Sequence, residues 1–150
     1  MLAPARPAIL VVEDPSLFMQ VLRDALRDVA GEFRLICVGT GHAAVAALMQ
    51  DPTIMVMIVD ITLDGELSGL DVLYQLRQFH VRPVAAGMPV AVLSGSDARI
   101  DMDAAAKMGG RFIPKPSRPD KIPDMHDAIE AWCSTLLETP LARVRHRETA

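Results

Sequence analysis

This chain of 150 residues has few aromatic side chains, few cysteines and no large excess of charge of either sign. Aromatic residues make up only 4% of the sequence, so an apolar fraction of 51% has to build its core mainly from Ala, Val, Leu, Ile and Met. A net charge of −4 gives no basic field that would attract nucleic acid or an anionic membrane surface. The length fits one domain.

The two cysteines, Cys37 and Cys133, lie far apart and form no CxxC or Cys/His pattern. Both stand in apolar periodic segments, so we expect buried thiols in a reducing compartment. The first residues, up to Asp14, lack a secretory signature. We therefore expect a cytoplasmic protein that neither enters a membrane nor binds nucleic acid directly.

The most informative stretch is the apolar run 54–59, which is rich in β-branched residues and ends on Asp60. An unbroken run of this kind is typical of a strand covered on both faces, as in a parallel sheet between helices, and it is too short to span a membrane. Ligands of such sheets bind at the carboxyl ends of the strands. A single Asp at that place is more commonly a helix N-cap or a solvated acid, so the other strand ends must decide its role.

Similar patterns along the chain predict five strands that alternate with five helices. The predicted strands are residues 8–12, 33–38, 54–60, 89–93 and 111–114. The predicted helices are residues 15–29, 42–49, 70–79, 97–108 and 122–137. Short connections favour right-handed crossovers and helices on both faces of the sheet. The expected fold is therefore α/β, a doubly wound, flavodoxin-like parallel sheet with strand order 2-1-3-4-5.

Polar side chains stand at the ends of four of these strands: Glu13 and Asp14, then Asp60, Ser94 and Lys115. In this strand order the first and third strands are neighbours, so the three carboxylates converge. They repel one another unless a cation or a proton compensates them, and such oxygen ligands suit Mg²⁺ in a site shared with phosphate. Together with an ammonium and a hydroxyl that can bind a phosphoryl group, the set predicts formation of an aspartyl phosphate.

Four segments, ILVVEDP, IVDITL, AVLSGS and FIPKP, resemble in order and spacing the receiver domain of two-component response regulators, over about residues 7–138. The resemblance implies that Asp60 is the phosphoacceptor. It also implies that Asp14, Asp60 and the backbone carbonyl of Thr62 ligate Mg²⁺, with Glu13 contributing through water.

The same resemblance assigns Ser94 and Lys115 to the phosphoryl oxygens and places Phe112 at the position of the family's switch aromatic. It implies a phosphoryl donor that is a sensor histidine kinase or a histidine phosphotransfer protein. A downstream protein would bind the fourth helix, fifth strand and fifth helix, or the domain would shuttle the phosphoryl group in a phosphorelay. The resemblance also allows a homodimer. It implies a signalling module rather than a turnover enzyme. We expect residues 1–138 to form the domain and residues 139–150 to form a flexible tail.

This sequence departs from the common family pattern in three ways. The loop from Asp60 to Gly69 is one residue longer than usual and lacks the usual proline, and Phe112 carries no hydroxyl where many members have Tyr.

The residues two beyond the phosphoacceptor and two beyond the hydroxyl residue, Thr62 and Ser96, are short and carry neither a carboxamide nor a carboxylate. Because neither can reach far into the site to orient water, we expect slow loss of the phosphoryl group.

Three other functions remain to be separated from this one. A flavodoxin-like FMN carrier needs a glycine- and hydroxyl-rich phosphate loop where this chain has Glu13, Asp14 and Pro15. An aspartate-nucleophile phosphatase should have an acid two residues after its nucleophile, where Thr62 stands. A degenerate receiver used only as a scaffold would not need the complete set of acids, hydroxyl and lysine.

Overall fold

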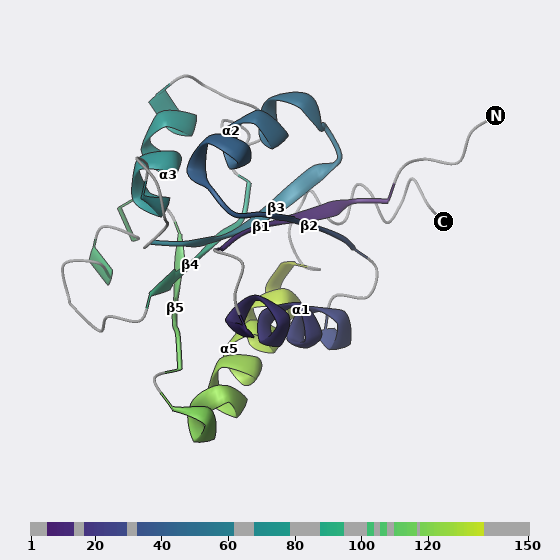
Figure 1. Ribbon diagram of the computed structural model, residues 1–150, viewed down its shortest axis with the longest axis vertical. Coiled ribbons are helices and arrows are strands. Elements are labelled where there is room, and N and C mark those ends of the chain that lie inside the picture. The colour runs from purple at the N-terminus through teal and green to yellow at the C-terminus, as the bar shows by residue number, and fades with distance from the viewer. Residues whose placement is uncertain are drawn as a thin grey trace.

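A parallel five-stranded sheet with the order β2-β1-β3-β4-β5 forms the centre of the protein, as predicted (Figure 1). This computed structural model describes residues 6–13, 17–29, 33–61, 68–78, 88–94, 102–103, 106–107, 110–116 and 118–136. The strands are β1 Ala8–Val12, β2 Arg34–Val38, β3 Ile54–Asp60, β4 Val90–Ser94 and β5 Arg111–Pro114. The helices are α1 Leu17–Val29, α2 Gly41–Gln50, α3 Gly69–Gln78 and α5 Ile122–Leu136, with a short 3₁₀ helix, η2, at Pro119–Lys121. Of the predicted helix 97–108, residues 102–103 and 106–107 are helical and the others lie outside the described residues.

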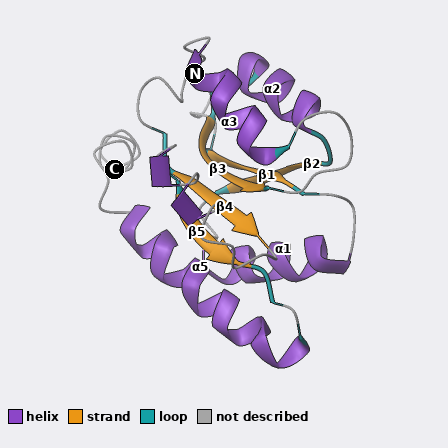
Figure 2. Cartoon of the chain, turned by 90° about the vertical axis from the view of Figure 1, so that its left-hand side faces the viewer, coloured by secondary structure: helices purple, strands orange, loops and turns teal. Residues whose placement is uncertain are grey.

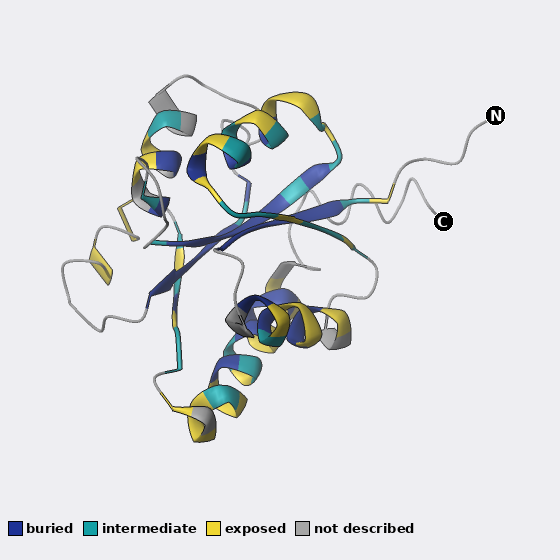
Figure 3. Cartoon of the chain, in the orientation of Figure 1, coloured by how far each residue is buried: buried dark blue, intermediate teal, exposed yellow. Residues whose placement is uncertain are grey.

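Helices cover both faces of the sheet, α2 and α3 on one and α1 and α5 on the other (Figures 1 and 2). The side chains of β1 alternate between two buried clusters, with Leu10 and Val12 on the side of α2 and α3 and Ile9 and Val11 on the side of α1 and α5. All five residues of β1 are buried, and this strand is dark blue in Figure 3. The continuous apolar runs of the sequence thus reflect burial on both faces.

An irregularity in β3 sets which residues meet at the end of the sheet. Ala8 pairs with Ile54, but Ile9 pairs with Val56, so Met55 is one extra residue opposite β1. Met55 and Val56 both pack on the side of α1 and α5. A bulge of this kind shifts the register by one residue. Val12 consequently pairs with Val59, and the residues that follow them, Glu13 and Asp60, become neighbours.

One face of α5 is apolar, because Met125, Ile129, Trp132 and Cys133 are buried in the cluster that α5 shares with α1. Pro123 lies in the first turn of α5, where the missing N–H breaks no helical hydrogen bond. Within the described ranges, no helix combines the length and apolar character that crossing a membrane requires.

The prediction that both thiols are buried is wrong for Cys37. Cys133 is buried on α5, but Cys37 is exposed on β2. β2 is an edge strand with a neighbour, β1, on one side only. An apolar pattern in the sequence does not distinguish an edge strand from a central one, and this explains the error.

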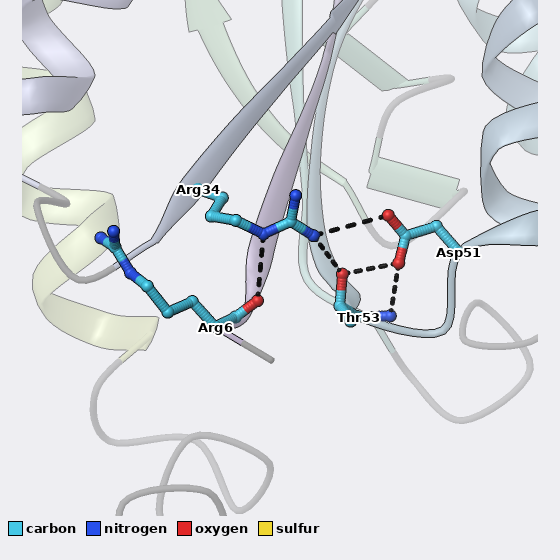
Figure 4. A network of polar contacts seen from close by, with 4 residues as sticks. All are labelled: Arg6, Arg34, Asp51 and Thr53. Carbon is cyan, nitrogen blue, oxygen red and sulfur yellow. Dashed lines mark hydrogen bonds and ion pairs between the residues drawn. The ribbon is translucent and has the colours of Figure 1, made fainter. Parts of the chain in front are cut away.

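A polar network at the opposite end of the sheet from Asp60 ties β2 to the turn before β3 (Figure 4). The guanidinium of Arg34 donates to the Thr53 hydroxyl at 2.7 Å and to the Arg6 carbonyl at 3.5 Å, and its Nη2 lies 3.6 Å from Asp51 Oδ2. The Thr53 hydroxyl and amide donate to Asp51 Oδ1 at 2.6 and 2.9 Å. These bonds lower the pKa of Asp51 below its ordinary 3.8, with a smaller contribution from the charge of Arg34.

Replacing Thr53 by Val keeps the shape of the side chain and removes the hydroxyl that links Arg34 to Asp51. We expect a loss of about 1 kcal/mol in the free energy of unfolding at neutral pH, measured with urea. Because the pKa of Asp51 is depressed in the folded state, its stabilising effect is present above the ordinary pKa of 3.8 and disappears as the pH falls through the lowered value. The difference in the free energy of unfolding between Thr53→Val and wild type should therefore become smaller at low pH. Equal free energies of unfolding at pH 7 would contradict this role of Thr53.

Candidate functional site

Four strand ends place polar side chains along one edge of the sheet. Glu13 follows β1, Asp60 ends β3, Ser94 ends β4 and Lys115 follows β5. Glu13, Asp60 and Ser94 are only 3%, 2% and 3% exposed, which makes them the buried polar residues of the part of the chain that the structure describes. The two other predicted metal ligands, Asp14 and Thr62, lie outside the described residues.

Backbone hydrogen bonds fix two of these residues where their strands have ended. The Glu13 amide donates to the Val38 carbonyl at 3.1 Å, which extends the pairing of β1 with β2 by one residue. The Lys115 amide donates to the Ser94 carbonyl at 2.7 Å, so the lysine is held beside the end of β4. These backbone hydrogen bonds fix the main chain at the two positions from which the side chains of Glu13 and Lys115 extend.

Lys115 joins the two buried acids. Its Nζ lies 2.6 Å from Asp60 Oδ2, and it lies 3.2 Å and 3.1 Å from Oε1 and Oε2 of Glu13. The lysine side chain is 21% exposed, whereas both acids are almost fully buried. The structure therefore brings together Glu13, Asp60 and Lys115 as the sequence predicts, with the ammonium reaching the acids from the solvent side.

The pKa values of Glu13 and Lys115 are both raised, but by different causes. The pKa of Glu13 is raised from 4.5 to about 7, mainly by burial and then by the hydrogen bond and charge of Asp60. The charge and hydrogen bond of Lys115 act in the opposite direction. Burial lowers the pKa of Lys115, but the bond and charge of Asp60, followed by those of Glu13, outweigh burial and raise it. Lys115 is thus a firmly charged ammonium, and Glu13 retains a proton up to near-neutral pH.

The residues present fit a hard divalent cation. The buried Oε2 of Glu13 has no hydrogen-bond partner among the described residues, although it makes an ion-pair contact with Lys115. Two carboxylates share one ammonium here, which leaves negative charge for a second cation when Glu13 is ionised. Carboxylate oxygens at partly hydrated sites are the ligands that Mg²⁺ prefers.

Phe112 lies on β5, paired with Val92 of β4. Its side chain is half-buried and packs against the cluster on the side of α2 and α3. The ring therefore stands next to the strand that ends at Ser94, two residues beyond Val92.

A second group of metal-ligating side chains lies on α5, where atoms of His126, Asp127 and Glu130 come within 4.8 Å of one another. Their spacing of i, i+1 and i+4 can be read from the sequence. His126 Nδ1 lies 4.0 Å from Glu130 Oε2, and both acids are exposed. Neighbouring helical positions bring such side chains together without a cation, so we assign the group no function.

Comparison with known proteins decides the family. The model of the response regulator receiver domain matches residues 9–127. The chain belongs to this family. No curated protein matches the sequence significantly.

Solved structures agree with the family and the fold. The phosphorylated cyanobacterial phytochrome response regulator RcpA is 22% identical, with a TM-score of 0.70 over 87% of this chain and 96% of that one. The Mn²⁺-bound response regulator Rcp1 is 25% identical, with a TM-score of 0.72 over 89% and 96%. A receiver protein from Pseudomonas putida is 24% identical, with a TM-score of 0.63 over 84% and 99%. The predicted family and fold class are therefore confirmed, and the FMN-carrier and phosphatase alternatives lose their support.

Replacing Glu13 by Gln should change how the stability of the receiver domain depends on pH. Without divalent cations, native Glu13 keeps its proton up to about pH 7, whereas the unfolded chain releases it near the ordinary pKa of 4.5. This group therefore makes the wild type less stable as the pH rises across that range, by about 3 kcal/mol. The Glu13→Gln variant cannot titrate at this position. Its free energy of unfolding, measured with urea at a series of pH values, should therefore fall less as the pH rises.

The matched control is Glu130→Gln, the same chemical change at a side chain that is 59% exposed. It should leave the slope near that of the wild type. A Glu13→Gln variant with the wild-type slope would show that Glu13 is ionised in the native site.

Proposed function

We propose that residues 1–138 form a receiver domain that accepts a phosphoryl group on Asp60 from a phosphohistidine. The donor would be a sensor histidine kinase or a histidine phosphotransfer protein. The observation that carries the proposal is the nearly fully buried Asp60 carboxylate at the carboxyl end of β3, 2.6 Å from the ammonium of Lys115. A buried acid held by a lysine at this edge of a parallel sheet is suited to accept an anionic group.

In the transfer, one oxygen of Asp60 forms a bond to phosphorus while the bond between phosphorus and the histidine nitrogen breaks. The imidazole leaves with the electron pair of that bond. Lys115 and the hydroxyl of Ser94 would donate to the phosphoryl oxygens, where negative charge is concentrated. Lys115 is already within hydrogen-bond distance of Asp60, so the positive charge is preorganised.

Mg²⁺ is the cation that we propose for the site. Asp14, Asp60 and the backbone carbonyl of Thr62 would hold it, and Glu13 would contribute through water. A bound Mg²⁺ would neutralise charge on the phosphoryl oxygens and so reduce the repulsion between donor and acceptor.

Phosphorylation would change the surface that a downstream protein binds. Ser94 would move to donate to the phosphoryl group, and the ring of Phe112 would occupy the space that it leaves. Because Phe112 has no hydroxyl, packing alone would bias the two positions. The surface of the fourth helix, β5 and α5 would then differ between the two states, and we do not expect direct binding to nucleic acid or membrane.

The domain would act in the cytoplasm as a signalling module and not as a turnover enzyme, with residues 139–150 outside it. It serves either as a switch read by a downstream protein or as a shuttle in a phosphorelay, and a homodimer is compatible with both. A degenerate receiver scaffold is the remaining alternative. The presence of Glu13, Asp60, Ser94 and Lys115 together favours a phosphorylated domain.

Asp60→Asn tests the assignment of the phosphoacceptor. Asn keeps the shape of the side chain and cannot form the acyl phosphate, so label from acetyl phosphate in the presence of Mg²⁺ should disappear while the circular dichroism spectrum stays unchanged. Asp24→Asn, at a side chain 75% exposed on α1, is the matched control and should label like wild type. Undiminished labelling of Asp60→Asn would place the phosphoryl group on another residue.

The lifetime of the phosphorylated state depends on how well water is oriented in line with phosphorus. Thr62 and Ser96, which lie outside the described residues, are too short to do this. We expect slow loss of label from the wild type and faster loss from Thr62→Asn, whose carboxamide can bind the attacking water. A wild type that loses its label within seconds, at a rate that the substitution does not change, would refute this explanation.

A further inference from the structure

The first residue of α3, Gly69, lies directly against the main chain of Asp60. A Cβ atom on Gly69 would lie 2.0 Å from the Asp60 carbonyl oxygen and 2.7 Å from its carbonyl carbon. It would also lie 3.0 Å from a methyl carbon of Val59. Ordinary contacts of a Cβ begin at 3.4 Å, so any residue with a side chain must displace either α3 or Asp60 by roughly an ångström or more.

Hydrogen bonds join the same segments. The Gly69 amide donates to the Ile61 carbonyl at 2.9 Å, and the Ile61 amide donates to the Leu93 carbonyl of β4, also at 2.9 Å. Both backbone groups of Ile61, the residue after the candidate phosphoacceptor, are therefore held, one by α3 and the other by β4. Asp60 is the last residue of β3, and this arrangement continues to fix its peptide where the strand ends.

The start of α3 is itself fixed independently of Asp60. The Ser68 amide donates to Asp71 Oδ2 at 3.0 Å, and the Asp71 amide donates to the Ser68 hydroxyl at 3.1 Å. This reciprocal pair is a capping box with Asp in place of Glu, and it holds the first turn of the helix. Gly69 therefore contacts Asp60 from a helix start that the capping box holds in place.

We propose that Gly69 is a positioning residue for the phosphoacceptor. By bringing α3 into contact with the Asp60 peptide, it keeps the carboxylate directed at Lys115, 2.6 Å away. This inference rests on the proposed function of Asp60. It adds that the start of α3, which carries no group of the predicted chemistry, determines the geometry of the reaction.

Gly69→Ala separates this role from an effect on the helix. Alanine is a better helix former than glycine, so helix propensity alone predicts a more stable α3. The contact with Asp60 predicts the opposite result at the site. A misplacement of about 1 Å can lower the rate of a positioned reaction by as much as roughly a hundredfold, so we expect label from acetyl phosphate to be incorporated about ten to a hundred times more slowly.

The matched control is Ser68→Ala, which weakens the capping box beside Gly69 and leaves the Asp60 contact intact. It should lower stability and leave the labelling rate near that of wild type. Hydrogen exchange of the Ile61 amide, followed by NMR, gives a readout that does not depend on phosphorylation. Exchange in Gly69→Ala should be faster than its change in global stability explains, whereas any acceleration in Ser68→Ala should match its loss of stability.

Two results would overturn the inference: a Gly69→Ala variant that labels like wild type with an unchanged Ile61 amide, or an equal loss of labelling in both variants. If wild type takes up no label, the proposed function fails, and Ile61 exchange still tests the contact. If Gly69→Ala does not fold, amide hydrogen exchange of the wild type tests the contact instead. The Gly69 and Ile61 amides should then open together with β3, and independent opening of Gly69 would refute the contact.

Discussion

The ion pair between Lys115 and Asp60 is the interaction on which the site depends. Two buried carboxylates at neighbouring strand ends would repel each other strongly in a dry environment. The ammonium 2.6 Å from Asp60 compensates one of them. A proton compensates the other, because burial and Asp60 raise the pKa of Glu13 to about 7. A cation that binds beside Glu13 near neutral pH would therefore compete with that proton.

Much of the fold could be predicted from the sequence, because continuous apolar runs that end on polar residues are characteristic of buried parallel strands. The run from Ile54 to Asp60 identifies β3, and the alternation of strands and helices leads to the observed strand order. The bulge at Met55 could not be predicted, since every position of the run is apolar and no periodicity marks an extra residue. The exposure of Cys37 was missed for a related reason, because its strand looks like a central one.

Three of the predicted site residues come together because parallel strands end at one edge, and the bulge in β3 sets the register in which Glu13 and Asp60 become neighbours. The roles within that group depend on depth and distance, which the sequence does not contain. Nothing in the sequence distinguishes Glu13, with its raised pKa and with an Oε2 that contacts Lys115 but accepts no hydrogen bond from the described residues, from an ordinary acid. Gly69 reads only as a glycine near the end of a loop, and its contact with the Asp60 carbonyl appears once β3 and α3 are packed.

The most direct test of this account is a calorimetric titration of the wild type with Mg²⁺ near pH 7, in two buffers of different ionisation enthalpy. If the cation replaces the proton of Glu13, the apparent binding enthalpy will differ between the buffers, which shows that a proton is released on binding. That release should disappear in Glu13→Gln. Binding without proton release, or no binding of Mg²⁺, would contradict the claim that the buried acids and Lys115 form a site for a cation and a phosphoryl group.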